Sequence, residues 1–222
     1  MQFEVHHAHA WDVTPKEAVA IQRNLAAKVR EEPLEADVET VAGIDVSIRE
    51  NTAQAAIAVV RLPDLKLVDR AIYRCEVPFP YIPGLLSFRE MPAILPALEK
   101  LSVRPDVLMT DSQGLAHPRR FGLACHLGVL LDWPALGVAK TRLTGRYEEP
   151  SEKKGAGAGL LDKGEVIGVA LRTRDRTNPV YVSIGHRIIL QEAVRLTLAC
   201  CPKYKIPEPT RLAHKLSRDE DV

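Results

Sequence analysis

The order of the predicted elements is what most constrains the fold of this chain. Three strand-like segments follow one another closely, at Thr40–Ile48, Ala55–Leu62 and Lys66–Glu76. Short connections such as Pro63-Asp64 permit a turn between antiparallel neighbours but leave no room for a crossover to a parallel strand. We therefore expect the sheet to begin as an antiparallel meander.

The remainder of the chain alternates between helical and strand-like patterns, which is typical of parallel pairing. A capping box at Thr14–Glu17 begins an amphipathic helix, and Leu85–Leu101 is a second helix that Pro92 and Pro96 can kink. The later elements are predicted at Asp106–Thr110 (strand), Arg119–Asp132 (helix), Ala135–Ala139, Glu165–Thr173 and Val180–Ile184 (strands), and His186–Cys200 and Glu208–Ser217 (helices). This order predicts an α/β protein with a mixed sheet flanked by helices. It fits several folds, among them the ribonuclease H-like fold.

Composition narrows the class of protein. A chain of 222 residues with 46% hydrophobic content is sized for a single domain with its own core, and the first ten residues, with three histidines, are expected to be a flexible, solvated tail. The four cysteines form no C-x-x-C pair, and no signal peptide or membrane-length apolar run is present. These features predict a cytoplasmic protein with reduced thiols. The net charge of +1 excludes a general basic field, so nucleic acid would need a local patch.

Two glycine- or proline-rich segments have different interpretations. Gly155–Gly159 is predicted to be a mobile loop, because it lacks the G-K-[ST] ending of a phosphate-binding loop. The segment Pro80–Glu90 places Tyr81 on a loop stiffened by proline and Glu90 on the helix that follows. Such a ring can wedge between stacked bases, and such a carboxylate can hold a metal. Taken alone, both residues also fit a packed ring and a solvated helix charge.

Acidic and basic residues follow several of the apolar strands. Asp45 lies within one apolar strand and Asp111 ends another, and ligand sites of open sheets form at the carboxyl ends of strands. If these strands are neighbours, the two carboxylates converge on a site whose oxygen ligands select Mg²⁺ or Mn²⁺ over zinc. Lys140 follows the strand Ala135–Ala139 and can stabilise charge on a phosphate. Either aspartate alone also fits an ordinary strand end.

The loop Ser112–Arg120 follows directly after Asp111. It carries backbone amides, a histidine and two arginines at a predicted helix N-terminus, where anions are favoured. We expect His117 and Arg119 to contact phosphate, although a solvated basic turn is the simpler alternative. His214, in the last predicted helix, carries little weight alone because lone histidines are usually structural.

Five segments occur together in one order along the chain. They are V-A-G-I-D, P-Y-I-P-G-L-L-S-F-R-E, D-S-Q-G-L-A-H-P-R, G-V-A-K and P-E-P-T-R-L-A-H. Together they resemble the endonuclease V family, the deoxyinosine 3′ endonucleases. The resemblance runs from about Trp11 to His214.

The resemblance implies a ribonuclease H-like fold and a metal-dependent endonuclease that uses Mg²⁺, for which Mn²⁺ substitutes. The family nicks DNA one nucleotide 3′ of a deaminated base, chiefly hypoxanthine, and leaves a 3′-hydroxyl and a 5′-phosphate. Its metal carboxylates match Asp45, Glu90 and Asp111, and its further catalytic positions match Lys140 and His214.

The family's recognition residues also have counterparts in this sequence. Tyr81 matches the wedge that fills the gap left by the extruded base. The expected lesion pocket consists of Gly84, Leu86, Ser112, Gly114, Gly122 and Leu143. Ser112 stands where the family usually has glycine, so its side chain can narrow the pocket or bond to O6 of the base.

Several alternatives remain at this level. The resemblance implies DNA containing deaminated bases as partner, but some relatives act on inosine RNA. Another nuclease on the same fold would use similar carboxylates without needing Tyr81, and an inactive nucleic-acid binder would not need three carboxylates. The size and modest charge permit a monomer, and no membrane partner is expected.

Overall fold

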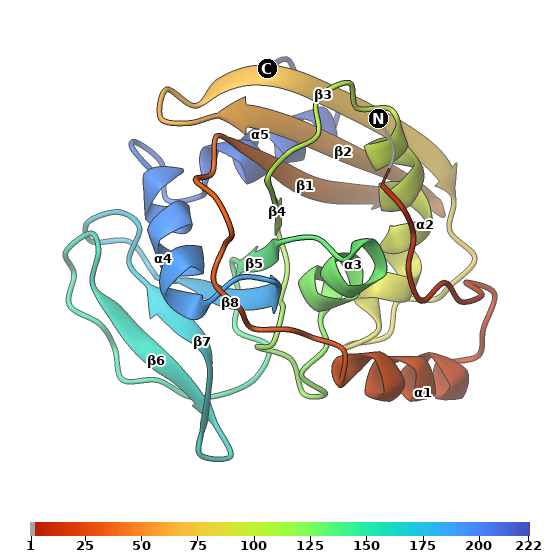
Figure 1. Cartoon of the computed structure of the whole chain (residues 1–222), viewed down its shortest axis with the longest axis horizontal. Helices are drawn as coiled ribbons and strands as arrows, with labels where there is room; N and C mark the ends of the chain where they lie inside the picture. The colour runs from red at the N-terminus through yellow and green to blue at the C-terminus, as the bar shows by residue number, and fades with distance from the viewer. Residues whose placement is uncertain (1–2) are drawn as a thin grey trace.

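The computed structural model describes residues 3–222 and contains one eight-stranded sheet (Figure 1). The strands lie in the order β3-β2-β1-β4-β5-β8-β7-β6. Their bounds are β1 (Thr40–Arg49), β2 (Thr52–Arg61), β3 (Lys66–Glu76), β4 (Val107–Thr110), β5 (Ala135–Ala139), β6 (Gly157–Asp162), β7 (Glu165–Leu171) and β8 (Val180–His186). The sheet is mixed, because β4 pairs in parallel with both β1 and β5 and the other pairs are antiparallel.

Residues 3–222 contain five helices, of which four cover the two faces of this sheet, while the first packs against the third (Figure 1). They are α1 (Pro15–Ala26), α2 (Leu86–Glu99), α3 (Leu123–Leu131), α4 (Leu190–Ala199) and α5 (Glu208–Leu216). On one face, α2 packs against β1, β2 and β3, and α3 packs against β4, β5 and β8, around residues such as Ile44 and Met91. On the other face, α4 and α5 pack against the sheet around Val41 and Ala213. Each face therefore has its own apolar core, as side chains alternate along a strand.

The register of β1 and β4 brings the predicted acidic residues together. The expected meander is present, and Ile44 of β1 pairs with Thr110 at the end of the parallel strand β4. Asp45 and Asp111 are the next residues along these two strands, and the backbone N–H of Asp111 bonds to the carbonyl of Ile44 at 3.1 Å. The metal hypothesis required these two strands to be neighbours, and the pairing of β1 with β4 confirms that they are.

Three predicted element boundaries were wrong. The helix predicted from Arg119 begins at Leu123, because Arg120 has a positive φ of 54° and Gly122 forms an extended N-cap. The helix predicted from His186 begins at Leu190, and His186 instead ends β8. The predicted mobile loop Gly155–Gly159 runs into β6, where Ala158 pairs with Ala170 of β7. Antiparallel pairing with β7, the next strand along the chain, stabilises this glycine-rich strand despite its low strand propensity.

The N-terminal residues pack on the domain, contrary to the expected solvated tail. Phe3 is buried against the ring of Trp133, and the N–H of His6 bonds to the carbonyl of Leu130 at 2.6 Å. The Nε2 atom of His9 lies 2.8 Å from that of the buried His126. Aromatic neighbours at the end of α3 thus hold a segment that composition alone marked as a tail.

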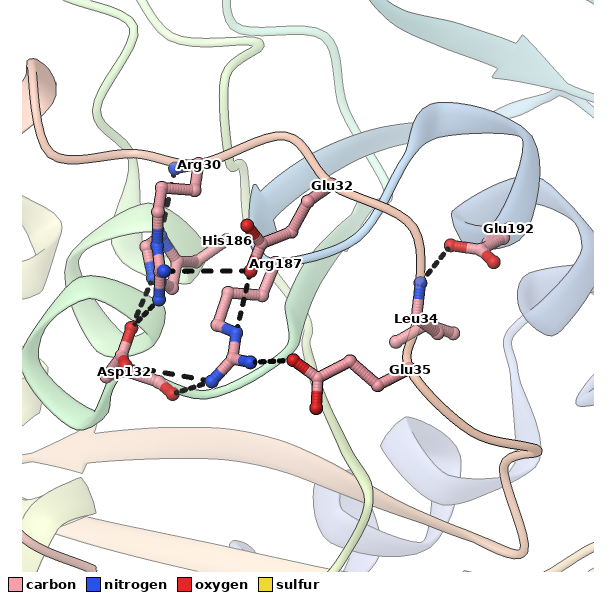
Figure 2. A network of polar contacts seen from close by, with 8 residues as sticks. All are labelled: Arg30, Glu32, Leu34, Glu35, Asp132, His186, Arg187 and Glu192. Atoms are coloured by element: carbon pink, nitrogen blue, oxygen red, sulfur yellow. Dashed lines mark hydrogen bonds and ion pairs between the residues drawn. The ribbon is translucent and has the colours of Figure 1, made fainter.

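A polar network ties the extended segment between α1 and β1 to the sheet (Figure 2). Asp132, just after α3, accepts a hydrogen bond from Nε2 of the buried His186 at 3.0 Å and forms ion pairs with Arg30 and Arg187. Arg187 also pairs with Glu35 at 2.7 Å.

Within residues 3–222, no helix has the length and apolarity needed to cross a membrane.

Candidate active site

A cluster of two carboxylates and an imidazole lies where β1, β4 and α5 meet. One ligand atom each from Asp45, Asp111 and His214 lies within 4.8 Å of the others. Asp45 faces α5 because it shares a face of β1 with Gly43, and an added Cβ at Gly43 would lie 2.0 Å from the carbonyl carbon of Pro209. The helix that carries His214 can approach Asp45 this closely only because β1 has a glycine there.

Hydrogen bonds orient this cluster. Oδ2 of Asp45 lies 3.1 Å from Nδ1 of His214 and accepts a hydrogen bond of 2.7 Å from the hydroxyl of Ser217. Lys140, at the end of β5, forms an ion pair with Asp111. Burial raises the pKa of Asp111, and Lys140 partly offsets this effect.

Glu90 completes a groove around the cluster. The groove, here called the carboxylate groove, has a volume of about 450 Å³ and is lined by Asp45, Val46, Ser47, Ile48, Arg49, Glu90, Asp111, Lys140, His214 and Arg218. Burial, with repulsion from Asp45 and Asp111, raises the pKa of Glu90 to about 8. Three carboxylates this close together repel one another, and a hard divalent cation relieves that repulsion with its preferred oxygen ligands. The donor set therefore fits a Mg²⁺-like ion.

A second hollow, here called the base cavity, adjoins the carboxylate groove. Its volume is about 390 Å³, and it shares Asp111 and Lys140 with the groove. The other lining residues are Gln22, Tyr81, Ile82, Pro83, Gly84, Leu86, Ser87, Ser112, Gln113, His117, Gly122, Leu123, Ala139, Thr141, Arg142 and Leu143. The size suits a small ligand, and mostly apolar walls with a few polar groups are typical of such sites.

Three side chains hold the loop that forms one wall of this cavity. The carbonyl of Gly84 accepts hydrogen bonds from Gln22 at 3.0 Å, from Arg119 at 2.6 Å and from Nε2 of His117 at 3.0 Å. Gly84 itself has a φ of 82°, which favours glycine. Burial, reinforced by Arg119, lowers the pKa of His117 to about 4, so this ring is neutral near neutral pH.

The rim of the base cavity is apolar and open. Tyr81 is 69% exposed and Leu143 is 44% exposed, although both are large hydrophobic side chains. Exposed rings at the mouth of a cavity are available to a ligand. Deeper inside, the hydroxyl of Ser112 lies 2.7 Å from that of Thr110, so the extra side chain already has a partner in the wall.

Most predicted site residues are brought together, and two are not where we expected them. Gly114 does not line the base cavity; it lies behind it, where an added Cβ would be 1.9 Å from the carbonyl oxygen of Ile184. His117 is only 3% exposed and both ring nitrogens are bonded, so it cannot contact phosphate as predicted. A phosphate contact by Arg119 stays a prediction.

Sequence reasoning missed three residues of the site. Gln22 is buried and bonds to the carbonyls of Gly84 and Phe121, and Gln113 and Ser217 also support the cavity and the cluster. A glutamine on the apolar face of α1, between Ala18 and Leu25, was the one available signal. A buried polar side chain in such a stripe needs partners from elsewhere in the chain.

Comparison with known proteins gives the family. The model of the family described as Endonuclease V matches residues 23–215. The chain belongs to the endonuclease V family. It is 52% identical to the endonuclease V of Rippkaea orientalis over 207 residues, which covers 92% of this chain and 90% of that relative.

Solved endonuclease V structures share the fold. The crystal structure of endonuclease V from Streptomyces avermitilis superposes with a TM-score of 0.90 at 42% identity, covering 99% of this chain and 97% of that one. The endonuclease V of Ciona intestinalis, solved with a 23mer DNA containing an inosine followed by a ribo-adenosine, has a TM-score of 0.82 at 27% identity, covering 93% and 98%. The predicted ribonuclease H-like fold and the family resemblance are confirmed.

Proposed function

We propose that this protein is a Mg²⁺-dependent endodeoxyribonuclease that nicks DNA one nucleotide 3′ of a deaminated base, chiefly hypoxanthine. The observation that carries the proposal is the junction of the two hollows. The base cavity and the carboxylate groove share Asp111 and Lys140. A nucleotide with its base in the cavity thus has its backbone beside the carboxylates.

The base cavity and its rim serve recognition. An extruded base enters between the Gly84 loop and the Ser112 region, while the exposed ring of Tyr81 fills the gap that it leaves. A pair that contains a deaminated base opens at lower cost than a normal pair, and this difference adds selectivity. Leu86, Gly122 and Leu143 give the cavity its apolar and close-fitting surface.

The carboxylate groove serves cleavage. Asp45 and Asp111 would hold Mg²⁺, for which Mn²⁺ can substitute, with Glu90 as the third acidic group. When bound, this ion supplies Lewis-acid stabilisation of a phosphoryl group. Lys140 stabilises negative charge on the phosphate, and His214 orients or exchanges a proton with the attacking water or the leaving oxygen. The products are a 3′-hydroxyl and a 5′-phosphate.

One assay tests this proposal. The protein is incubated with Mg²⁺ and matched duplexes that differ only by a single deoxyinosine. We expect one nick, in the deoxyinosine strand only, and none with Asp45→Ala or with EDTA. Equal cutting of both duplexes rejects lesion specificity, binding without cutting identifies an inactive binder, and an active Asp45→Ala variant refutes the metal assignment.

A second candidate is an endoribonuclease that acts on inosine RNA. The complex of the Ciona intestinalis relative, in which a ribo-adenosine follows the inosine, favours its inclusion. Single-stranded RNA and DNA that carry one inosine, and DNA with one ribonucleotide 3′ of the inosine, separate the two candidates. We propose DNA as the main substrate, a monomer as the active form and the cytoplasm as its location.

A further inference from the structure

A basic hollow lies apart from the catalytic groups, at the end of β7. It has a volume of about 450 Å³, and its charged lining consists of Lys154, Arg174, Arg176 and Lys203 with a single acid, Asp175. All four cationic residues are exposed. In a chain of net charge +1, an excess of three positive charges in one hollow is a local concentration of charge.

The positive charge of this basic hollow is not neutralised within the protein. The ion pairs nearest in sequence, Arg172 with Glu149 and Arg211 with Glu208, engage other cations. Among residues 3–222, the four cationic side chains form no ion pair with a carboxylate, and Asp175 itself accepts the backbone N–H of Lys154 at 2.7 Å. The acid therefore shapes the loop. Nζ of Lys154 donates to the backbone carbonyl of Cys201, and Arg174, Arg176 and Lys203 stay available to an anionic partner.

The strand register places the basic hollow on the edge of the sheet that carries the catalytic groups. Ala139, the residue before Lys140, pairs with Tyr181 of β8, and Tyr181 pairs with Ala170 near the end of β7. The segment Thr173–Arg176, which begins two residues after the end of β7, thus continues the edge formed by Asp111 and Lys140. Three strand spacings separate β4 from β7, which is about 15 Å, or about four base pairs along a duplex.

Another cation, Lys205, lies between Lys140 and the basic hollow. Lys205 is half-buried, and its backbone carbonyl accepts a hydrogen bond of 2.6 Å from Thr173, one of the lining residues. Burial, with repulsion from Arg172 and Lys140, lowers the pKa of Lys205. Lys205 therefore lies near enough to Lys140 for their charges to repel, and its backbone contacts a residue of the basic hollow.

We propose that the basic hollow is a second nucleic-acid contact, which binds backbone phosphates about four base pairs from the site of cleavage. The contact is to phosphates rather than to bases, because the cations are exposed surface side chains without the fixed geometry that hydrogen bonding to a base edge requires. The position relative to cleavage rests on the proposed function, whereas the phosphate contact itself does not. Its role is to add affinity for longer substrates without adding sequence preference.

The test compares two double charge reversals that change the net charge equally. Arg176→Glu/Lys203→Glu alters the basic hollow, and Lys66→Glu/Arg70→Glu alters exposed cations of β3, the opposite edge strand. Each protein is bound to a long undamaged duplex over a range of salt concentrations. We expect the basic-hollow variant to lose at least tenfold in affinity and about two units of salt slope, and the β3 variant to match the unaltered protein. Equal losses in both variants, or none in either, overturn the proposal.

A cleavage assay then locates the contact. The basic-hollow variant is given two deoxyinosine duplexes, one with about ten base pairs on each side of the lesion and one that ends about three base pairs away in closed hairpins. We expect kcat/KM to fall at least tenfold on the long duplex only, and equal falls on both overturn the position. If the unaltered protein cuts neither duplex, the proposed function fails while the binding test still decides on the basic hollow.

Discussion

At the residue scale, the carbonyl of Gly84 makes one wall of the base cavity sensitive to pH through His117. The backbone N–H of Arg119 donates to Nδ1 of His117, so Nε2 carries the proton that bonds to Gly84. The folded pKa of His117 is about 4, below its ordinary value of 6.5. Between these two pH values, the unfolded chain binds a proton at His117 and the folded protein does not. The stability that the neutral ring contributes is therefore lost as the pH falls from 6.5 towards 4.

His117→Gln should reduce this pH dependence, because glutamine can still donate to Gly84 but does not titrate. The measurement is the free energy of unfolding by urea between pH 4 and pH 8, on the unaltered protein and the variant. We expect the unaltered protein to lose more stability than the variant as the pH falls from 6.5 towards 4. His126 and His186 also have lowered pKa values, so some slope will remain in the variant. Parallel curves would show that His117 does not titrate as described.

Tyr81 is the residue at which the proposed role in base recognition can be separated from stability. Because its side chain is largely exposed, Tyr81→Ala should leave the melting temperature unchanged while weakening binding of deoxyinosine DNA about 5- to 100-fold. Tyr81→Phe, which keeps the ring, should bind like the unaltered protein. Affinity is measured in EDTA, where no cleavage occurs. Unaltered affinity of Tyr81→Ala would remove the wedge role.

At the scale of elements, the contact of α5 with β1 depends on Gly43. Gly43→Ala forces a methyl group into the backbone of Pro209, and the helix that carries His214 must move. We expect a loss of about 1–3 kcal/mol in stability and a fall in kcat/KM of about 100-fold, since a small misplacement of the proposed catalytic group His214 is costly. Gly159→Ala in β6 is the matched control, because its new Cβ would meet only Val166 at 4.0 Å. Normal activity in Gly43→Ala would show that the position of α5 is not critical.

Asp132 is one of the residues that hold the segment between α1 and β1 in place, beside Arg187 and Glu192 (Figure 2). Asp132 has a positive φ of 47°, which asparagine tolerates and alanine does not tolerate well. Asp132→Ala should cost about 2–3 kcal/mol, because the buried His186 and two arginines lose their common acceptor. Asp132→Asn should cost less than half as much. Urea unfolding of both variants measures the difference, and equal losses would assign the whole effect to charge.

At the scale of the whole molecule, local patterns predicted seven of the eight strands, including the edge strand β3, and missed only β6 at the other edge. Apolar composition was almost enough to predict β1, β4 and β5. The parallel pairing of β1 with β4 then placed Asp45 beside Asp111. The edge strand β6 was missed because its glycines and alanines gain order only from pairing with β7.

The limits of prediction in the site have the same physical origin. Gln22 reaches Gly84 across 62 positions of sequence, and no local pattern specifies such a partner. The burial of His117 likewise results from tertiary packing around the Gly84 loop, so its motif indicated the right region but the wrong contact. Residues whose role depends on the end of a strand were predictable, and those whose role depends on a distant partner were not.

Metal binding should be visible in the stability of the whole molecule. An ion that binds only the folded state raises the free energy of unfolding by about 2.7 kcal/mol at a concentration of 100 times its Kd. We expect Mg²⁺ to raise the melting temperature of the unaltered protein above its value in EDTA. Asp45→Asn should abolish this rise, because it removes one charged ligand of the cluster. Glu99→Gln, an exposed acid at the end of α2, should keep the full rise.

For each protein, the melting temperature in Mg²⁺ is compared with the melting temperature of the same protein in EDTA. Any effect of a substitution on the metal-free protein therefore cancels. Because Asp45, Asp111 and His214 come from β1, β4's end and α5, an ion held among them links elements that are far apart in the sequence. The stabilisation should therefore appear in the cooperative unfolding of the whole domain rather than in one local segment. An equal rise in Asp45→Asn and in the unaltered protein would place the Mg²⁺ site elsewhere.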